Sequence, residues 1–272
     1  MTLTSSFPLP PPAQAHRTKG ISLRPFVSIA ALIVAWQVLW SLGIIPARGF
    51  PSVPQTLIAF WTMMTEPFAG QPIWMHIGIS LLRWAIGVGG AIVVGVTLGA
   101  IMGWYPIARA MVRPLFEFFR YIPPLAWAPL TILILGPTLQ AAALVVFVGA
   151  LPPVVINAWS GVYHIEPILA DAARTLGAGR FRSLVRVAVP VATLSILSGI
   201  RTAVSAGWGS LIGAELVGAQ SGLGFIIVSS QAAYRPADVM VGMLLIGMIG
   251  MAIDKIFRTL SASGTRWLGA SL

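Results

Sequence analysis

Long apolar runs separated by short polar segments constrain the fold of this chain more than any other feature. Six runs have, or approach, the length of about 20 residues that a helix needs to cross the hydrocarbon core of a bilayer. Backbone polar groups in lipid must be satisfied within the chain, so these runs predict an all-α polytopic membrane protein with six transmembrane helices. We place the helices at Phe26–Ile45, Ile77–Trp104, Tyr121–Leu135, Leu139–Trp159, Val187–Val217 and Ala237–Phe257.

Composition agrees with the bilayer as the solvent. Hydrophobic residues make up 57% of the chain and charged residues 9%, which leaves too little polar surface to cover a water-soluble domain. The formal net charge of +10 is spread over short basic clusters between the apolar runs, so we expect no nucleic acid partner. The chain has no cysteine, which excludes disulfides and metal sites built on thiolates.

The basic clusters predict the orientation of the chain. By the positive-inside rule, loops rich in lysine and arginine lie in the cytoplasm, so both termini are predicted to be cytoplasmic. Residues 1–25 are expected to form a disordered cytoplasmic tail, residues 26–260 the transmembrane domain, and residues 261–272 a cytoplasmic C-terminal tail. Two basic residues fall on the opposite side, Arg48 and Arg235, whereas the cytoplasmic set is Arg17, Lys19, Arg24, Arg109, Arg113, Arg120, Arg174, Arg180, Arg182, Arg186, Lys255, Arg258 and Arg266.

A polar, arginine-rich island interrupts the apolar runs at residues 171–190, which read DAARTLGAGRFRSLVRVAVP. Pro167 can start a short helix just before it, and Gly177 can end that helix in the left-handed conformation that glycine adopts most easily. The resulting amphipathic helix, of about ten residues, carries an apolar face suited to a groove on a partner protein. That face comprises Leu169, Ala172, Ala173 and Leu176.

The island resembles the EAA loop of ABC importer permeases, the docking helix that binds the ATPase subunit in that family. The match consists of an acidic residue, two alanines, a glycine and a later apolar segment ending in proline, with aspartate in place of the usual glutamate. It is carried by Asp171, Ala172, Ala173, Gly177, Val187, Val189 and Pro190. The resemblance implies a cytoplasmic docking loop over residues 160–186, whose contact residues are Leu169, Asp171, Ala172, Ala173, Leu176, Gly177 and Arg180.

The resemblance extends over most of residues 80–254, where the chain is similar to the taurine, sulfonate, nitrate and bicarbonate branch of that family. In the second run, small residues recur every four positions, which lets another helix approach closely. The third run opens with YIPPLAWAPL, whose prolines force kinks that are tolerated where a helix lines a cavity. The resemblance implies a fold like that of the type I ABC importer permeases. The matching residues include Ser80, Arg83, Gly87, Gly95, Gly99, Gly103, Trp127, Gly199, Arg201, Trp208, Glu215 and 222–225.

Three residues are candidates for a translocation pathway: Arg201, Glu215 and Trp127. Arg201 lies near the middle of the fifth run, where an ionised group usually faces the bundle interior or water. It either adds positive potential to an anion pathway or bonds carbonyl groups of a broken helix. Glu215 lies about four turns further along the same helix, too far to pair with Arg201. Arg83 is expected to snorkel to the outer interface, and His76 is expected to be interfacial.

Catalytic chemistry finds little support in the residues. The histidines are scattered and the carboxylates form no tight pair, so we expect neither a catalytic site nor a metal site. No lysine follows the spaced glycines of a phosphate-binding loop, so ATP and Mg²⁺ are expected to bind to a separate subunit and this chain to hold no cofactor.

The interpretation that follows is the membrane subunit of a bacterial ABC importer for a small anion such as a sulfonate, taurine, nitrate or bicarbonate. The resemblance implies a homodimer in the inner membrane, two ATP-binding subunits, an extracytoplasmic binding protein and contact with membrane lipid. Two alternatives stay open: a secondary transporter or channel that is not coupled to an ATPase, and a membrane-embedded enzyme.

Overall fold

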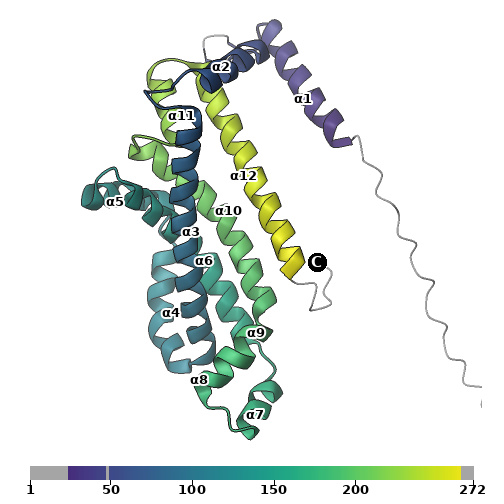
Figure 1. Cartoon of the computed structure of the whole chain (residues 1–272), viewed down its shortest axis with the longest axis vertical. Coiled ribbons are helices and arrows are strands. Elements are labelled where there is room, and N and C mark those ends of the chain that lie inside the picture. Colours follow the sequence, from purple (N-terminus) through teal and green to yellow (C-terminus); the bar gives the residue numbers. More distant parts are fainter. Residues whose placement is uncertain (1–23, 47–48, 265–272) are drawn as a thin grey trace, which may run out of the picture. The chain divides into compact units, whose positions relative to one another are not determined.

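The computed structural model describes residues 24–46 and 49–264, and this part of the chain is almost entirely helical (Figure 1). The described residues contain a single isolated β-bridge, between Phe68 and Gln71. The predicted all-α class is therefore confirmed. The predicted tails lie outside the described residues, except for residues 24–25 and 261–264, which are helical.

The chain divides into two compact units, residues 1–47 and residues 48–272. The first unit contains helix α1 (Arg24–Ser41), which corresponds to the predicted first transmembrane run. Its apolar part, Val27–Ser41, is shorter than a full span. This length is one reason why the predicted count of six spans is not confirmed.

The second unit begins with helix α2 (Val53–Thr65), which we did not predict. Ser52 caps it: its hydroxyl accepts from the Gln55 amide, while the Gln55 side chain accepts from the Ser52 amide. This reciprocal capping box satisfies amides that have no partner within the helix. Helix α2 then buries Met63 against Leu223 and Val241, so it belongs to the core of the unit.

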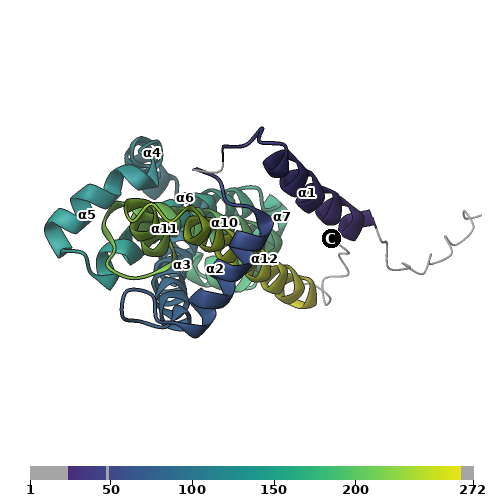
Figure 2. The same ribbon diagram turned by 90° about the horizontal axis from the view of Figure 1, so that it is seen from above.

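Helices α3 (Ile73–Trp104) and α6 (Leu139–Tyr163) form the centre of the second unit, where they lie side by side (Figures 1 and 2). The glycine ladder of α3 faces α6. A Cβ added at Gly87 would lie 2.6 Å from the carbonyl oxygen of Ala143, and one at Gly99 would lie 2.6 Å from that of Val155. Both distances are below any real contact, so the backbones touch as closely as glycine allows. The close approach predicted from the four-residue spacing is confirmed.

The predicted third span, Tyr121–Leu135, forms the second half of a bent helix pair. Helix α4 (Pro106–Arg120) is followed by one 3-10 turn, η1 (Pro124–Trp127), and by helix α5 (Ala128–Leu135). The two halves of this pair meet at 88°. Proline lacks the amide donor and restricts the residue before it, so the consecutive prolines Pro123 and Pro124 explain the break.

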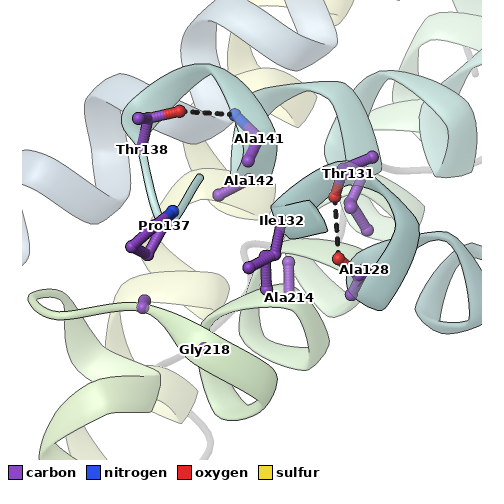
Figure 3. Close-up of a pocket in the computed structure, with 11 residues that line it drawn as sticks. Ala128, Thr131, Ile132, Pro137, Thr138, Ala141, Ala142, Ala214 and Gly218 are labelled. Atoms are coloured by element: carbon purple, nitrogen blue, oxygen red, sulfur yellow. Dashed lines mark hydrogen bonds between the residues drawn. The ribbon is translucent and has the colours of Figure 1, made fainter. Parts of the chain in front are cut away.

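Helix α5 packs closely onto α6 and onto helix α10 (Thr193–Gly218), as Figure 3 shows. The space left between them is about 10 Å³, which is roughly the volume that a single water needs. The Thr131 hydroxyl donates to the Ala128 carbonyl, 2.9 Å away, so this buried hydroxyl has a hydrogen-bond partner (Figure 3). A Cβ at Gly218 would lie 2.7 Å from the Cδ1 of Ile132. This packing holds α5 firmly in its bent position.

The remaining elements complete the second unit. Helix α7 (Pro167–Thr175) and helix α8 (Arg180–Ser183) lie at the end of the bundle opposite α2 and helix α11 (Leu223–Ala232) (Figure 1). A π-helical turn, η2 (Leu184–Ala188), and the short α9 (Val189–Val191) connect α8 to α10. Helix α12 (Pro236–Gly264) packs on α2 and α11. The fifth run, predicted to begin at Val187, is therefore broken before Thr193.

Four helical segments in the described ranges are long and apolar enough to cross a membrane, and the bent pair makes a fifth. They match the predicted second, fourth, fifth and sixth runs, and the predicted third run matches only the second half of the bent pair, Pro124–Leu135. Multi-pass membrane character is thus confirmed, while the count of six depends on α1. The predicted boundaries missed α4 because its four charged side chains had suggested a connecting loop.

Candidate functional site

The predicted docking helix is present as α7. Pro167 is its first residue, and Gly177 follows its end with φ of +79°, the left-handed conformation expected from the sequence. The amide of Ala178 donates to the carbonyl of Ala173, 3.0 Å away, which closes the helix end. Pro167 and Gly177 thus mark the start and the end of this helix, as the sequence predicted.

The exposed surface of this loop is more apolar than the sequence suggested. Leu176 is 88% exposed and Phe181, on α8, is 71% exposed; Ile168 and Leu169 are exposed as well. Ala173 differs from the other three residues of the predicted apolar face, because it is buried against the protein itself. Sequence spacing placed Ala173 correctly on the helix but did not show which neighbour covers it.

The loop is fastened to the bundle on its inner side. The Trp104 indole, at the end of α3, donates to the carbonyl of Arg180 at 3.1 Å. Leu184 and Ala188 of η2 are buried against Ala100 of α3 and Ala158 of α6. A force applied to α7 and α8 is therefore transmitted directly to the ends of the two central helices.

Charged groups surround the exposed apolar surface without burying it. Asp171 and Arg174 form an exposed ion pair of 3.1 Å along α7, which contributes little to stability because solvent screens it. Arg180 is also exposed. These groups are thus accessible to a partner.

The structure does not bring the three pathway candidates to one surface. Arg201 is exposed on α10, on the same face as Ser198, Thr202 and Ser205. Such a polar face on a membrane-spanning helix is costly in lipid, so it favours contact with water or protein. Glu215 lies further along α10 and is fully buried.

Trp127, the third candidate, lines a cavity of about 300 Å³ under the bend between α4 and α5. Phe116, Phe119 and Arg120 contribute to the same walls. The buried Trp127 indole nitrogen has no hydrogen-bond partner in the described part of the chain. Arg120 is already paired with Glu117, at 2.7 Å.

A buried polar cluster that the sequence did not predict lies at the end of the bundle near α2 and α11. Arg83 donates to Glu215 at 2.9 Å, and their side chains are 4% and 0% exposed. Arg83 therefore does not snorkel to the interface, because its guanidinium pairs with a buried carboxylate instead. His76 is buried as well, against our expectation of an interfacial position. Residues far apart in sequence build this cluster, so spacing gave no signal for it.

Within the described residues, no group of three or more histidine, cysteine, aspartate or glutamate side chains is close enough to hold a metal ion.

Comparison with known proteins identifies the family. The profile of the family described as "Binding-protein-dependent transport system inner membrane component" matches residues 91–262, which include α7, α8 and α10. The chain belongs to this family. The permease is 30% identical over 243 residues to the taurine transport system permease protein TauC of Escherichia coli, covering 89% of this chain and 88% of that protein.

Other relatives of the permease carry different names. It is 28% identical over 245 residues to the nitrate import permease protein NrtB of Synechocystis, covering 88% of each chain. It is 30% identical over 265 residues to the bicarbonate transport system permease protein CmpB of Synechococcus elongatus, covering 93% of this chain and 91% of that one.

A solved structure supports the fold. The inward-facing MetNI methionine ABC transporter contains a chain that matches the permease with a TM-score of 0.56 at 22% identity, covering 69% of this chain and 95% of the other. The type I ABC importer permease fold expected from the sequence is thereby confirmed. The permease is a multi-pass membrane component of an ABC importer.

Proposed function

We propose that this permease forms the membrane path of an ATP-driven importer for a small anion, of the class that includes sulfonates, taurine, nitrate and bicarbonate. The observation that carries the coupling to ATP is the exposed apolar surface of α7 and α8, centred on Leu176 and Phe181. A surface of this kind, fastened to the ends of α3 and α6, suits a groove on an ATPase.

The anion class rests on two supports. The relatives named above are described as taurine, nitrate and bicarbonate permeases. Arg201 adds a positive charge to the exposed polar face of α10, where an anion would be attracted. We assign Arg201 and Trp127 to the pathway, and we give the buried Glu215 a positioning role.

The assembly follows from the number of docking loops. One chain carries one such loop, so two ATP-binding subunits require a second copy of the permease, and the path then lies between the copies. A binding protein delivers the substrate on the outer side of the bacterial inner membrane, and lipid surrounds the remaining apolar faces. Both termini and the docking loop lie in the cytoplasm. ATP and Mg²⁺ bind to the partner ATPase, and no cofactor is assigned to this chain.

Replacing Leu176 with aspartate tests the docking assignment. Burying a leucine side chain in a partner's groove contributes about 1.5–3 kcal/mol, and a desolvated carboxylate in its place costs more. We expect Leu176→Asp to insert normally in the membrane but to lose the copurifying ATPase. Leu176→Met keeps the apolar bulk and should retain it. Full ATPase recovery with Leu176→Asp would show that this surface is not the docking site.

Two further variants separate the fold of the loop from its contact. Gly177→Val forces a branched side chain into a left-handed conformation, and Ala173→Asp buries a charge between the loop and the bundle. Both should lose the ATPase through a distorted loop. Protease sensitivity of the loop should therefore rise in these two variants and stay unchanged in Leu176→Asp.

A further inference from the structure

Three consecutive amides at the start of α11 are each bound by a side chain from another part of the chain. The Gly222 amide donates to His76 Nδ1 at 3.1 Å, the Leu223 amide to the Ser80 hydroxyl at 2.9 Å, and the Gly224 amide to Glu215 Oε2 at 2.9 Å. The first amides of a helix have no partner within it, and they attract negative charge. Glu215 thus places a carboxylate where the α11 dipole favours one.

The Glu215 carboxylate is in turn held from the side of α3. The Ser80 hydroxyl lies 2.8 Å from Oε1 and 3.0 Å from Oε2 and shares its single proton between them, and Arg83 donates to Oε1 at 2.9 Å. Arg83 also donates to the carbonyl oxygen of Ser221 at 2.6 Å. The carboxylate therefore links α3, α10 and the first turn of α11 through bonds that are all buried.

His76 closes the same cluster. Its Nδ1 accepts from Gly222, so its Nε2 must carry the proton and donates to the Phe68 carbonyl at 3.2 Å. The ring stacks on Phe225 with centroids 5.9 Å apart. The turn between α2 and α3 is thereby tied to the same point.

The glycines of this turn are required by the carboxylate. Gly222 has φ of +113°, and a Cβ there would lie 2.3 Å from Glu215 Oε1. A Cβ at Gly224 would lie 2.6 Å from the Glu215 Cβ. The segment from Gly222 to Phe225, which the sequence matched to the permease family, is therefore shaped around one side chain.

We propose that Glu215 is a positioning residue, which anchors the start of α11 and, with Arg83 and Ser80, makes α3, the end of α10 and α11 move as one body during transport. A buried ion pair adds little stability over an apolar pair of the same shape, but removing one partner is strongly unfavourable. The linkage therefore stays closed through the transport cycle, and bending is confined to the breaks at Pro123–Pro124 and before Thr193.

The proposal rests on the permease function but not on the docking loop, since the cluster lies at the other end of the bundle (Figure 1). Failure of the two ideas is therefore distinguishable. Variants of the cluster should retain the copurifying ATPase, whereas variants of the exposed loop surface should lose it.

Paired substitutions test the anchoring role. In the reconstituted importer, Glu215→Gln should lower ATP-driven uptake by at least about tenfold, because it leaves Arg83 buried without a countercharge. The double variant Arg83→Met/Glu215→Gln should recover uptake, since glutamine still accepts from the α11 amide and no unpaired charge remains. The exchanged pair Arg83→Glu/Glu215→Arg should stay inactive, because arginine cannot accept from an amide.

The control is Arg235→Gln, which removes an ion pair between the exposed Arg235 side chain and the partly exposed Asp238 side chain near the same end and should leave uptake unchanged. Recovery of uptake in the exchanged pair would overturn the proposal, since the ion pair alone would then suffice. Loss of the double variant from the membrane would also overturn it, because the cluster would then serve folding only. Uptake that falls only in proportion to the amount of protein would have the same meaning.

A distance measurement tests the movement directly. The chain has no cysteine, so spin labels can be placed at Gly78→Cys on α3 and Tyr234→Cys after α11, both of which are exposed. The distance between the labels should be the same with and without trapped ATP in the complete importer. In the Glu215→Gln variant, the distribution of distances between the two labels should become broader. A nucleotide-dependent change in the otherwise unaltered chain would show that α11 moves separately from α3.

Discussion

The contact between α3 and α6 yields the most quantitative prediction, because two glycines of the same helix provide a matched pair. A Cβ at Gly99 would lie 2.6 Å from the Val155 carbonyl oxygen and 2.9 Å from the Trp159 amide nitrogen. Both are backbone atoms, which cannot rotate away. Ordinary contact begins at 3.4 Å, so α6 would have to retreat by 0.8 Å (3.4 − 2.6). A Cβ at Gly89, in contrast, meets no atom within 4 Å.

The two substitutions to alanine therefore differ in one respect. Each gains about the same helix propensity, up to ~1 kcal/mol, while only Gly99→Ala overpacks the interface, at about 1–3 kcal/mol. The difference between the variants is thus about 1–3 kcal/mol, which corresponds to roughly 5 °C in melting temperature for a chain of this size. Gly99→Ala should melt lower than Gly89→Ala.

Thermal unfolding of the purified permease in detergent, followed by circular dichroism of the helices, measures this difference. Gly89→Ala also controls for any effect of alanine on the unfolded chain. Equal melting temperatures for the two variants would refute the reasoning, because they would mean that α3 and α6 do not touch at Gly99.

Three other predictions follow from named residues. A cysteine at Tyr234 should react with an impermeant thiol reagent from outside, and a cysteine at Gly179 should react from inside. Reaction of both from one side would contradict the predicted orientation. Cysteines at Ser52 and Ser183 would not serve as probes, because both positions are buried. Arg201→Lys should transport better than Arg201→Gln if charge attracts the anion, whereas equal loss with impaired assembly would indicate a structural role. Ser52→Ala should lower stability by about 0.5–2 kcal/mol in thermal unfolding, because α2 loses its cap, and an unchanged melting temperature would exclude that role.

Much of the fold could be predicted because long apolar runs in the sequence indicate membrane helices. The apolar runs gave the ends of α3 and α6 to within four residues and those of α10 and α12 to within seven, and the four-residue spacing of glycine gave the close contact between α3 and α6. Pro167 and Gly177 gave the ends of α7, because both residues act through local backbone conformation. Such local rules need no knowledge of the tertiary structure.

The parts that were missed depend on tertiary contacts. Helix α4 carries its arginines against aromatic rings of α6: Arg109 lies 4.6 Å from the Tyr163 ring and Arg113 lies 5.4 Å from the Trp159 ring. These cation–π contacts let a basic segment run along the bundle, where charge alone had suggested a loop. Arg83 and Glu215 are separated by 132 positions, so no spacing rule connects them. The inward position of Ala173 likewise depends on residues outside its own helix.

We propose that this permease moves a small anion at the expense of ATP hydrolysed by a separate subunit. The decisive measurement is uptake into proteoliposomes that contain the permease, its ATPase and its binding protein, with labelled taurine, nitrate and bicarbonate offered in turn. We predict that one of these anions accumulates only when ATP is present on the docking-loop side. Accumulation that proceeds equally without ATP, driven by an ion gradient, would contradict the claim and favour a secondary transporter.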